Sequence, residues 1–391
     1  NLLHLAIKAK EIDRENIPSS NLVFLIDVSG SMNMPNRLPL VIESFKLLIN
    51  QLSKHDVVSI VTYAGTEKVV AKGIYGHQKE RLYQALEELQ AGGSTAGGAG
   101  IKKAYEIGKE YYIEGGNNRV ILATDGDFNV GVSSEGALVR LIEEKRKTGI
   151  YLSILGYGMG NYQESKMQEL SKAGNGNHFY IDNLDEAKKC LINEFGGTLY
   201  TVANDVKFQV EFNPSLVSGY RVLGYENRQM ANTDFNDDTK DAGELGAGHV
   251  VTVLFEIIPL GAQSKYISST DTLKYSTRQE ANNVNLQELA TIKARYKSDL
   301  QSASIKVERP ITTAIDSWDK LSSAVKWSTI VAEFGLLLRD SPYKASSDYV
   351  TLIQRAKRLA QDEHQKECVK LIEKAYKLNI NKAAQELSEI E

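Results

Sequence analysis

The hydrophobic and polar positions divide the chain into three stretches with different periods. From residue 21 to about residue 198, short runs of consecutive apolar residues alternate with segments whose apolar residues recur at helical spacing. Uninterrupted apolar runs are typical of strands buried on both faces, as in parallel sheets. Strands separated by helices of about ten or more residues need crossover connections. We therefore predict an α/β fold with a doubly wound, mostly parallel, Rossmann-like sheet for this stretch.

The predicted elements of this stretch follow one another in regular alternation. The strand at 68–72 is short, and we expect it to lie at an edge of the sheet. The predicted strands are 22–26, 57–63, 68–72, 119–124, 150–155 and 178–181. The predicted helices are 38–52, 79–89, 99–112, 135–148, 163–173 and 184–195.

The next stretch alternates with period two, which is typical of half-buried strands. Apolar residues occupy every second position from Val206 to Phe212, and further strands are predicted at 250–258 and 286–296, with Asn, Asp and Gly between them as turns. We predict an antiparallel, sandwich-like β region. The strand near the start of the chain, 2–9, has the same alternation and no helix beside it, so we expect it to pair with this β region.

From about residue 310 the pattern becomes helical again. Helices are predicted at 322–339, 349–362, 365–377 and 382–390, and Trp327 and Phe334 lie on one face of the first, as expected for a core stripe. We predict a packing unit of three or four helices. The predicted organisation is 1–20, a strand pairing with the β region; 21–198, the α/β domain; 199–305, the antiparallel β region; and 306–391, the helical C-terminal region.

Composition narrows the classes of function. Of 391 residues, 42% are hydrophobic and 25% charged, as in ordinary globular proteins, and the net charge of −4 offers no basic footprint for nucleic acid. No apolar stretch reaches the ~18 residues of a membrane span. We expect Cys190 and Cys368 to be thiols without a disulfide between them. The first residue is Asn1 within a predicted strand, which suggests a processed or trimmed chain whose leader or anchor would lie upstream.

A carboxylate and two hydroxyls directly follow the first buried strand. The apolar run 22–26 stops at Asp27, Ser29 and Ser31 come next, and a helix begins near residue 38. Ligands of open α/β sheets bind at the carboxyl ends of the strands. Asp and Ser are also favoured helix caps, which is the simpler interpretation. A cap needs one such residue, so three at alternate positions favour a binding site.

Two later loops carry matching oxygen donors. Thr95 lies in the glycine-rich run 92–98, and Asp125 follows the buried run 120–123. An oxygen-only set suits a hard cation such as Mg²⁺, Mn²⁺ or Ca²⁺ rather than Zn²⁺. The six histidines form no pair at metal-ligand spacing. The glycine-rich run lacks the Gly-Lys-Ser/Thr ending of a phosphate-binding loop, so its glycines more plausibly let Thr95 approach the cation.

These five positions together resemble a von Willebrand factor type A domain with its metal-ion-dependent adhesion site. The resemblance implies that Ser29, Ser31 and Thr95 bind the cation directly or through water, while Asp27 and Asp125 act through water or from behind those ligands. It implies a non-enzymatic module in which the cation captures an acidic residue of a partner protein. The final helix of such domains, here 184–195, can shift on occupancy, which makes allosteric coupling conceivable.

The wider chain is similar to bacterial von Willebrand A proteins that carry an extra β region and a C-terminal domain of unknown function. The segments 224–228 and 234–238 and the helical tail contribute to this resemblance. It implies an extracytoplasmic, cell-envelope-associated location. Partner identity, oligomeric state and the physiological cation do not follow from the sequence.

Several alternatives stay open at this stage. Asp127 and Asn129 would either rim the site or form a solvated loop, and we favour the loop. The segment 234–241 resembles a calcium loop superficially, but Thr239 and Leu245 stand where an EF-hand needs Gly and Glu, so we favour a solvated turn. A metal-dependent hydrolase is an alternative function, although no paired carboxylates or nearby general base support it. A structural role in an envelope assembly is the other alternative.

Overall fold

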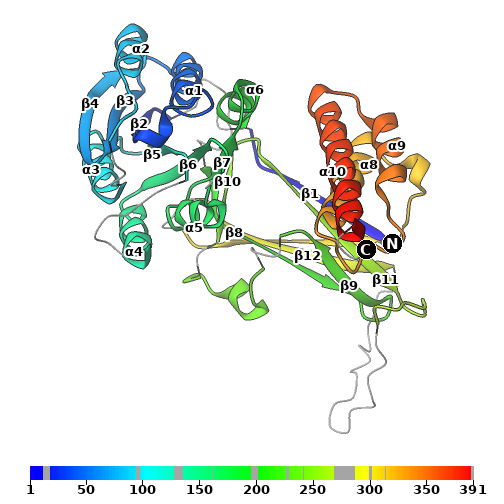
Figure 1. Ribbon diagram of the computed structural model, residues 1–391. Coiled ribbons are helices and arrows are strands. Elements are labelled where there is room, and N and C mark those ends of the chain that lie inside the picture. Colours follow the sequence, from blue (N-terminus) through cyan, green and yellow to red (C-terminus); the bar gives the residue numbers. More distant parts are fainter. Residues whose placement is uncertain are drawn as a thin grey trace.

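The computed structural model describes three regions that follow one another along the chain (Figure 1). An α/β domain, a pair of small antiparallel sheets and a unit of three helices are visible as separate bodies. The described residues are 1–11, 18–93, 97–126, 135–160, 162–194, 201–225, 229–240, 242–267, 287–298, 302–312 and 314–388.

The α/β domain is built on a sheet of six strands. All neighbouring strands are parallel except β4, which is antiparallel to β3 at the edge. The predicted mostly parallel sheet is therefore confirmed, although the edge strand is longer than expected. In spatial order the strands are β4 (Thr66–Tyr75), β3 (Val57–Ala64), β2 (Ser20–Asp27), β5 (Asn117–Thr124), β6 (Ile150–Tyr157) and β7 (His178–Ile181).

Alternate residues of the central strand β2 enter two different cores. Phe24 and its neighbours two positions away pack toward one face, where Phe24 stacks on Phe45 with ring centroids 4.1 Å apart. Val23 and Leu25 enter the opposite core. Burying each such side chain stabilises the fold by roughly 1.5–3 kcal/mol, so β2 is fixed from both sides.

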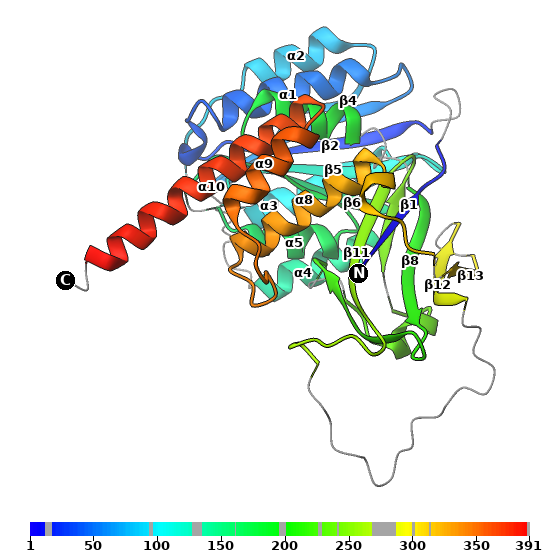
Figure 2. The same cartoon turned by 90° about the vertical axis from the view of Figure 1, so that its right-hand side faces the viewer.

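Helices cover both faces of the sheet (Figures 1 and 2). The first face carries α1 (Leu38–Gln51), α2 (Lys79–Glu87) and α6 (Leu184–Lys188). The second carries α3 (Gly97–Glu110), α4 (Glu135–Arg146) and α5 (Glu164–Ala173). The predicted single helix at 184–195 is instead α6 followed by a π-helical turn, η3 (Lys189–Glu194).

The β region consists of two antiparallel sheets, and the first strand of the chain belongs to one of them. Leu5 of β1 (Leu2–Lys8) lies opposite Val253, which confirms that this strand pairs with the β region. The sheet orders are β1-β11-β9 and β10-β8-β12-β13. The remaining strands are β8 (Thr201–Phe212), β9 (Val217–Leu223), β10 (Gly243–Gly246), β11 (Val250–Pro259), β12 (Glu288–Lys297) and β13 (Ile305–Thr312).

The two sheets share a small core, as a sandwich does. Phe212 of β8 lies against Tyr220 of β9, with ring centroids 4.3 Å apart, and also against Phe255 of β11. Strands β9, β10 and β13 were not predicted. β10 has four residues, and β13 is an exposed strand containing Pro310, which is tolerated at an edge but weakens the sequence signal.

Three helices form the C-terminal unit around Ile330, Leu352 and Ile372. They are α8 (Ser323–Leu338), α9 (Tyr349–Leu359) and α10 (Glu363–Ser388). The two last predicted helices are one continuous helix, because no Gly or Pro interrupts 363–388. Trp327 and Phe334 pack against this core, as predicted. No helix in the described part of the chain combines the length and apolar composition that a bilayer-spanning segment requires.

Both cysteines carry thiols, with Cys190 buried in η3 and Cys368 half-buried in α10. This agrees with the expectation that no disulfide joins them. The residue limits that we assigned to the four regions stay predictions.

Candidate metal site

Two neighbouring parallel strands deliver a carboxylate each to the same edge of the sheet. Strand β2 ends at Asp27, which is fully buried, and β5 is followed directly by Asp125, which is 6% exposed. Because Ile26 lies opposite Ala123 in the β2–β5 register, the two strand ends are adjacent. The structure thus brings these two predicted residues together. Thr95 lies outside the described residues, as do Asp127 and Asn129.

The two oxygens of Asp27 are committed to donors within the protein. The backbone N–H of Ser29 donates to Oδ1 at 2.8 Å. The Tyr63 hydroxyl donates to Oδ2 at 3.1 Å, and the Thr124 hydroxyl donates to the same oxygen at 3.3 Å. Burial raises the pKa of Asp27, and the charge of Asp125 raises it further. Asp27 therefore organises the loop from behind instead of presenting a carboxylate to solvent.

The loop after β2 places the two serine hydroxyls side by side. Ser29 Oγ and Ser31 Oγ are 3.1 Å apart, across the short turn η2 (Gly30–Met32). The Gly30 N–H donates to the carbonyl of Gly93 at 3.1 Å, which holds the loop that leads to Thr95 against this turn. Ser29 is buried, whereas Gly30 and Ser31 are exposed. The pair of hydroxyls therefore extends from the buried Ser29 to the exposed Ser31.

The capping interpretation of these residues does not hold. The N-cap of α1 is Arg37, and it makes no side-chain capping bond. Ser29 precedes the η2 turn but its side chain does not cap it either. The bond from Ser29 N–H to Asp27 instead closes a local turn of the kind that Asp side chains often form. The three alternating polar residues are therefore available for a role other than helix capping.

An arginine that the sequence analysis did not identify contacts the site. Arg37 Nη1 donates to Asp125 Oδ2 at 2.7 Å and to the carbonyl of Ser31 at 2.7 Å. Tyr63 and Thr124 were also missed as partners of Asp27. Thr124 could have been found as the residue before Asp125 in a buried strand. Neither Tyr63 nor Arg37 has a local sequence signal, because each reaches the site only through the three-dimensional fold.

Aromatic side chains support the loop that carries Asp125. Gly126 adopts a positive φ of 86°, and a Cβ at this position would lie 2.5 Å from the Tyr162 ring. Tyr162 stacks on His178 and meets Tyr180 edge-on. Burial lowers the pKa of His178. Only glycine can follow Asp125 here, since the Tyr162 ring occupies the space of a side chain.

The donor set fits a hard divalent cation. Two buried carboxylates lie close enough that one raises the pKa of the other, and two adjacent hydroxyls face the same edge of the sheet. Oxygen donors of this kind are the ligands that Mg²⁺ and Mn²⁺ prefer. Among the described residues, no three His, Cys, Asp or Glu side chains gather as a metal-binding group. The described residues therefore hold no cluster of the His and Cys ligands that zinc usually binds. A site built from serine and threonine hydroxyls needs no such cluster.

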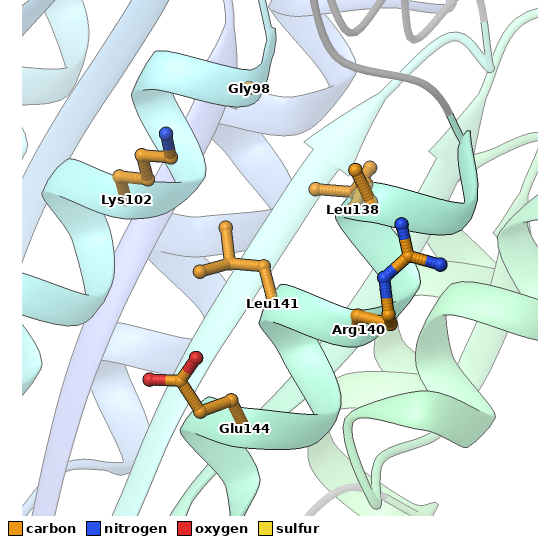
Figure 3. Close-up of a pocket in the computed structure, with 7 residues that line it drawn as sticks. Gly98, Lys102, Leu138, Arg140, Leu141 and Glu144 are labelled. Atoms are coloured by element: carbon orange, nitrogen blue, oxygen red, sulfur yellow. The ribbon is translucent and has the colours of Figure 1, made fainter.

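Two hollows in the surface of the described residues lie away from the site. A shallow one of about 290 Å³ lies between α3 and α4 (Figure 3). Lys102 and Arg140 rise on its two sides, and Leu138 and Leu141 form its floor. A second, of about 370 Å³, lies between β9 and the end of α8. Neither of these two hollows includes Asp27, Ser29, Ser31 or Asp125.

The second acidic segment, 234–240, is fixed by cations of the chain itself. Arg295 Nη2 donates to Asp238 at 2.9 Å, and Lys207 Nζ donates to the carbonyl of Asp237 at 2.7 Å. Phe235, in the short turn η5 (Asn232–Asn236), is buried. The segment is a largely exposed turn, as we expected, and in addition three basic residues of β8 and β12 contact it. These contacts make a calcium loop less favourable, since the carboxylates already have partners; Asp241 lies outside the described residues.

Comparison with known proteins separates the chain into two matched parts. Residues 21–192 match the family model of the von Willebrand factor type A domain, and residues 197–378 match the model of the C-terminal part of the uncharacterized protein YfbK. YfbK of Escherichia coli (strain K12) is 41% identical over 378 residues, which are 96% of this chain and 64% of YfbK. The chain therefore spans just under two thirds of that relative.

Two more distant similarities cover about half and nearly all of the chain, respectively. The uncharacterized protein sll0103 of Synechocystis sp. is 26% identical over 188 residues, 47% of this chain and 43% of that protein. The solved structure of a von Willebrand factor type A protein from Catenulispora acidiphila covers 95% of this chain and 88% of its own, with a TM-score of 0.50 and 14% identity. At that identity the likeness concerns the fold alone.

Proposed function

We propose that this chain, whose residues 21–192 match the family model of the von Willebrand factor type A domain, is a non-enzymatic module that captures a partner protein through a divalent cation. One observation carries the proposal. Asp27 is fully buried with both oxygens bonded to the protein, while the hydroxyls of Ser29 and Ser31 lie 3.1 Å apart beside Asp125. This arrangement leads from the buried carboxylate of Asp27 through the hydroxyl of Ser29 to the exposed hydroxyl of Ser31.

The residues divide the work by their charge. Ser29 and Ser31, with Thr95 as a predicted third, would hold the cation, and Asp27 and Asp125 would orient them and compensate part of its charge. A cation held by neutral hydroxyls supplies an undercompensated coordination position to a partner carboxylate. Mg²⁺ or Mn²⁺ suits the donor set, with Ca²⁺ as a third option. The recognised feature is then an exposed Asp or Glu on the partner.

The other regions would present this site. The tail contacts the sheet β1-β11-β9, since His4 lies 3.2 Å from Ser328 and the guanidinium of Arg221 lies over the Tyr343 ring. The α6–η3 segment packs on α1, which makes it the path by which occupancy of the site could reach the β region. An extracytoplasmic, cell-envelope-associated location remains part of the proposal, supported by the family resemblance alone.

A paired capture experiment tests the proposal. The chain and its Asp27→Ala variant are immobilised, and extract of the source organism is passed over each with Mg²⁺ or with a chelator. We expect one protein to be retained only by the parent chain in Mg²⁺, and a carboxyl-to-amide substitution on that protein to abolish retention. Asp238→Ala, an acidic residue outside the site, serves as the matched control and should behave as the parent.

Equal retention in every lane would contradict the proposal. It would indicate that the partner binds to the β region or the helical tail, and that the cation has only a structural role. Turnover of a phosphate or carboxyl ester that is lost in Asp27→Ala would contradict it in the other direction, in favour of a hydrolase.

A further inference from the structure

Arg37 connects three loops around the candidate site. It lies at the start of α1, and its guanidinium reaches the loop after β2 at the Ser31 carbonyl (2.7 Å), the loop after β5 at Asp125 Oδ2 (2.7 Å) and the loop after β6 at the Met159 carbonyl (3.2 Å). The side chain of Arg37 is 18% exposed, and that of Asp125 is 3% exposed. This ion pair is therefore more sheltered than the usual surface pair, which contributes little.

We propose that Arg37 is a positioning residue that sets the balance between the two ligands of the site: it weakens the hold on the cation and strengthens the capture of the partner's carboxylate. The inference rests on the proposed function and adds to it a residue outside the five positions of the adhesion motif. It concerns the charge that the chain itself brings to Asp125.

The fold reserves space for this side chain. Gly158 has a positive φ of 79°, and a Cβ there would lie 2.4 Å from Arg37 Nε. The Tyr180 hydroxyl donates to the carbonyl of Gly158, which fixes the backbone that Arg37 passes. A substituted residue at position 158 would therefore displace the guanidinium. The close approach of glycine indicates that the position of Arg37 is built into the loop and is not a chance surface contact.

Charge counting gives the direction of both effects. Asp27 and Asp125 bring two negative charges when ionised, and Arg37 reduces the sum to −1. A bound divalent cation then leaves the site at +1, which attracts a carboxylate. Without Arg37 the two carboxylates would neutralise the cation completely, so the cation would be held more tightly and would attract a partner carboxylate less.

The size of each effect follows from the sheltered position of the pair. An opposite charge within ~4–6 Å changes the proton affinity of a carboxylate by roughly 10- to 1,000-fold. A divalent cation that shares the same carboxylate should respond by a factor of about ten or more. The two affinities should move in opposite directions, which a role in folding alone would not produce.

The test measures both affinities on the full chain. Free Mn²⁺ is followed by its electron paramagnetic resonance signal during titration of the parent, Arg37→Gln, Arg37→Lys and, as a matched control, Arg81→Gln, an exposed arginine on α2. Glutarate is then added to the Mn²⁺-loaded proteins as a carboxylate probe, and water proton relaxation reports its binding. Circular dichroism melting shows that each variant is folded.

For Arg37→Gln we expect Mn²⁺ to bind about tenfold more tightly and glutarate about tenfold more weakly than in the parent. Arg37→Lys, which keeps the charge but not the three-way contact, should fall between the two, and Arg81→Gln should match the parent. Two results in a folded Arg37→Gln protein would overturn the inference: both affinities unchanged, or both affinities reduced together. Either result would mean that Arg37 only supports the structure of the loops. A folded parent that takes up no Mn²⁺ would instead overturn the proposed function, and the inference with it.

Discussion

Two acidic loops of this chain have opposite electrostatic surroundings. Beside Asp27 and Asp125, the guanidinium of Arg37 lies 2.7 Å from Asp125 Oδ2. Around Asp205 and Asp238 stand Lys207, Lys297 and Arg295. The first loop keeps an excess of negative charge, whereas the second is neutralised by the chain. The difference teaches that a cluster of acidic residues in the sequence is not enough to identify a cation site. The number of basic side chains that the fold brings near those residues must also be known.

The pKa shifts of the carboxylates in the two loops have opposite signs, and their main causes differ. Burial raises the pKa of Asp27. Hydrogen bonds from Thr239 lower the pKa of Asp237, and one from Ser304 lowers that of Asp238. Ionisation is thus opposed at Asp27 and supported at the second loop. A cation from solution would stabilise the negative charge of the first loop. It would add little at the second loop, where basic side chains of the protein already do so.

The largest expected loss of stability comes from removing a basic side chain that neutralises the second loop. Lys207 is almost fully buried, with its ammonium 3.2 Å from Asp205 and 2.7 Å from the carbonyl of Asp237. Lys207→Met would leave the buried Asp205 with Lys297 alone, and we expect a loss of about 3 kcal/mol in the free energy of unfolding. Urea unfolding of the β region measures it. Lys306→Ala, which removes an exposed pair with Glu308, is the control; a loss of equal size there would refute the distinction.

The next effect separates the two loops by their response to cations. At a Mg²⁺ or Mn²⁺ concentration 100 times the dissociation constant, binding stabilises the folded state by about 2.7 kcal/mol. We expect this gain in the parent and in Asp238→Asn, and its absence in Asp27→Ala. Thermal melting with cation and with chelator gives the comparison. A cation effect that disappears in Asp238→Asn instead would place the cation at the second loop.

The smallest expected effect on stability concerns His178, which stacks on Tyr162 beneath the loop that carries Asp125. Burial holds the pKa of His178 below its ordinary value of 6.5, so below about pH 6.5 the unfolded chain takes up this proton before the folded chain does. Stability should therefore be complete above pH 6.5 and fall as the pH drops toward the lower folded pKa. We expect a loss below ~1 kcal/mol, because His178 is only partly buried.

Unfolding by urea at pH 7.5 and at pH 5.5 measures this loss. The difference between the two values should shrink in His178→Gln, whereas His55→Gln, an exposed histidine, should leave it unchanged. An identical pH dependence in parent and His178→Gln would show that the support under Gly126 does not titrate in this range.

The sequence predicted an element or a site residue correctly where a local pattern has one usual structural meaning. Continuous apolar runs predicted the parallel strands, and Asp27 and Asp125 were found because each directly follows such a run. Strands with mixed exposure were missed: β13 carries Lys306, Glu308 and Pro310 on an exposed edge, so no periodicity marks it. Arg37 and Tyr63 were missed because their partners lie 88 and 36 positions away and only the fold brings them together.

The pairing of β1 with β11 has a mechanical consequence. The chain leaves the β region at Lys8, forms the whole α/β domain and returns to the β region at β8, so the domain is an insertion carried on two arms rooted in the β region. A load applied at the Asp27 edge is divided between these two arms instead of passing along a single linker. A partner held at that edge would pull on a domain that the chain joins to the β region on both sides, at β1 and at β8.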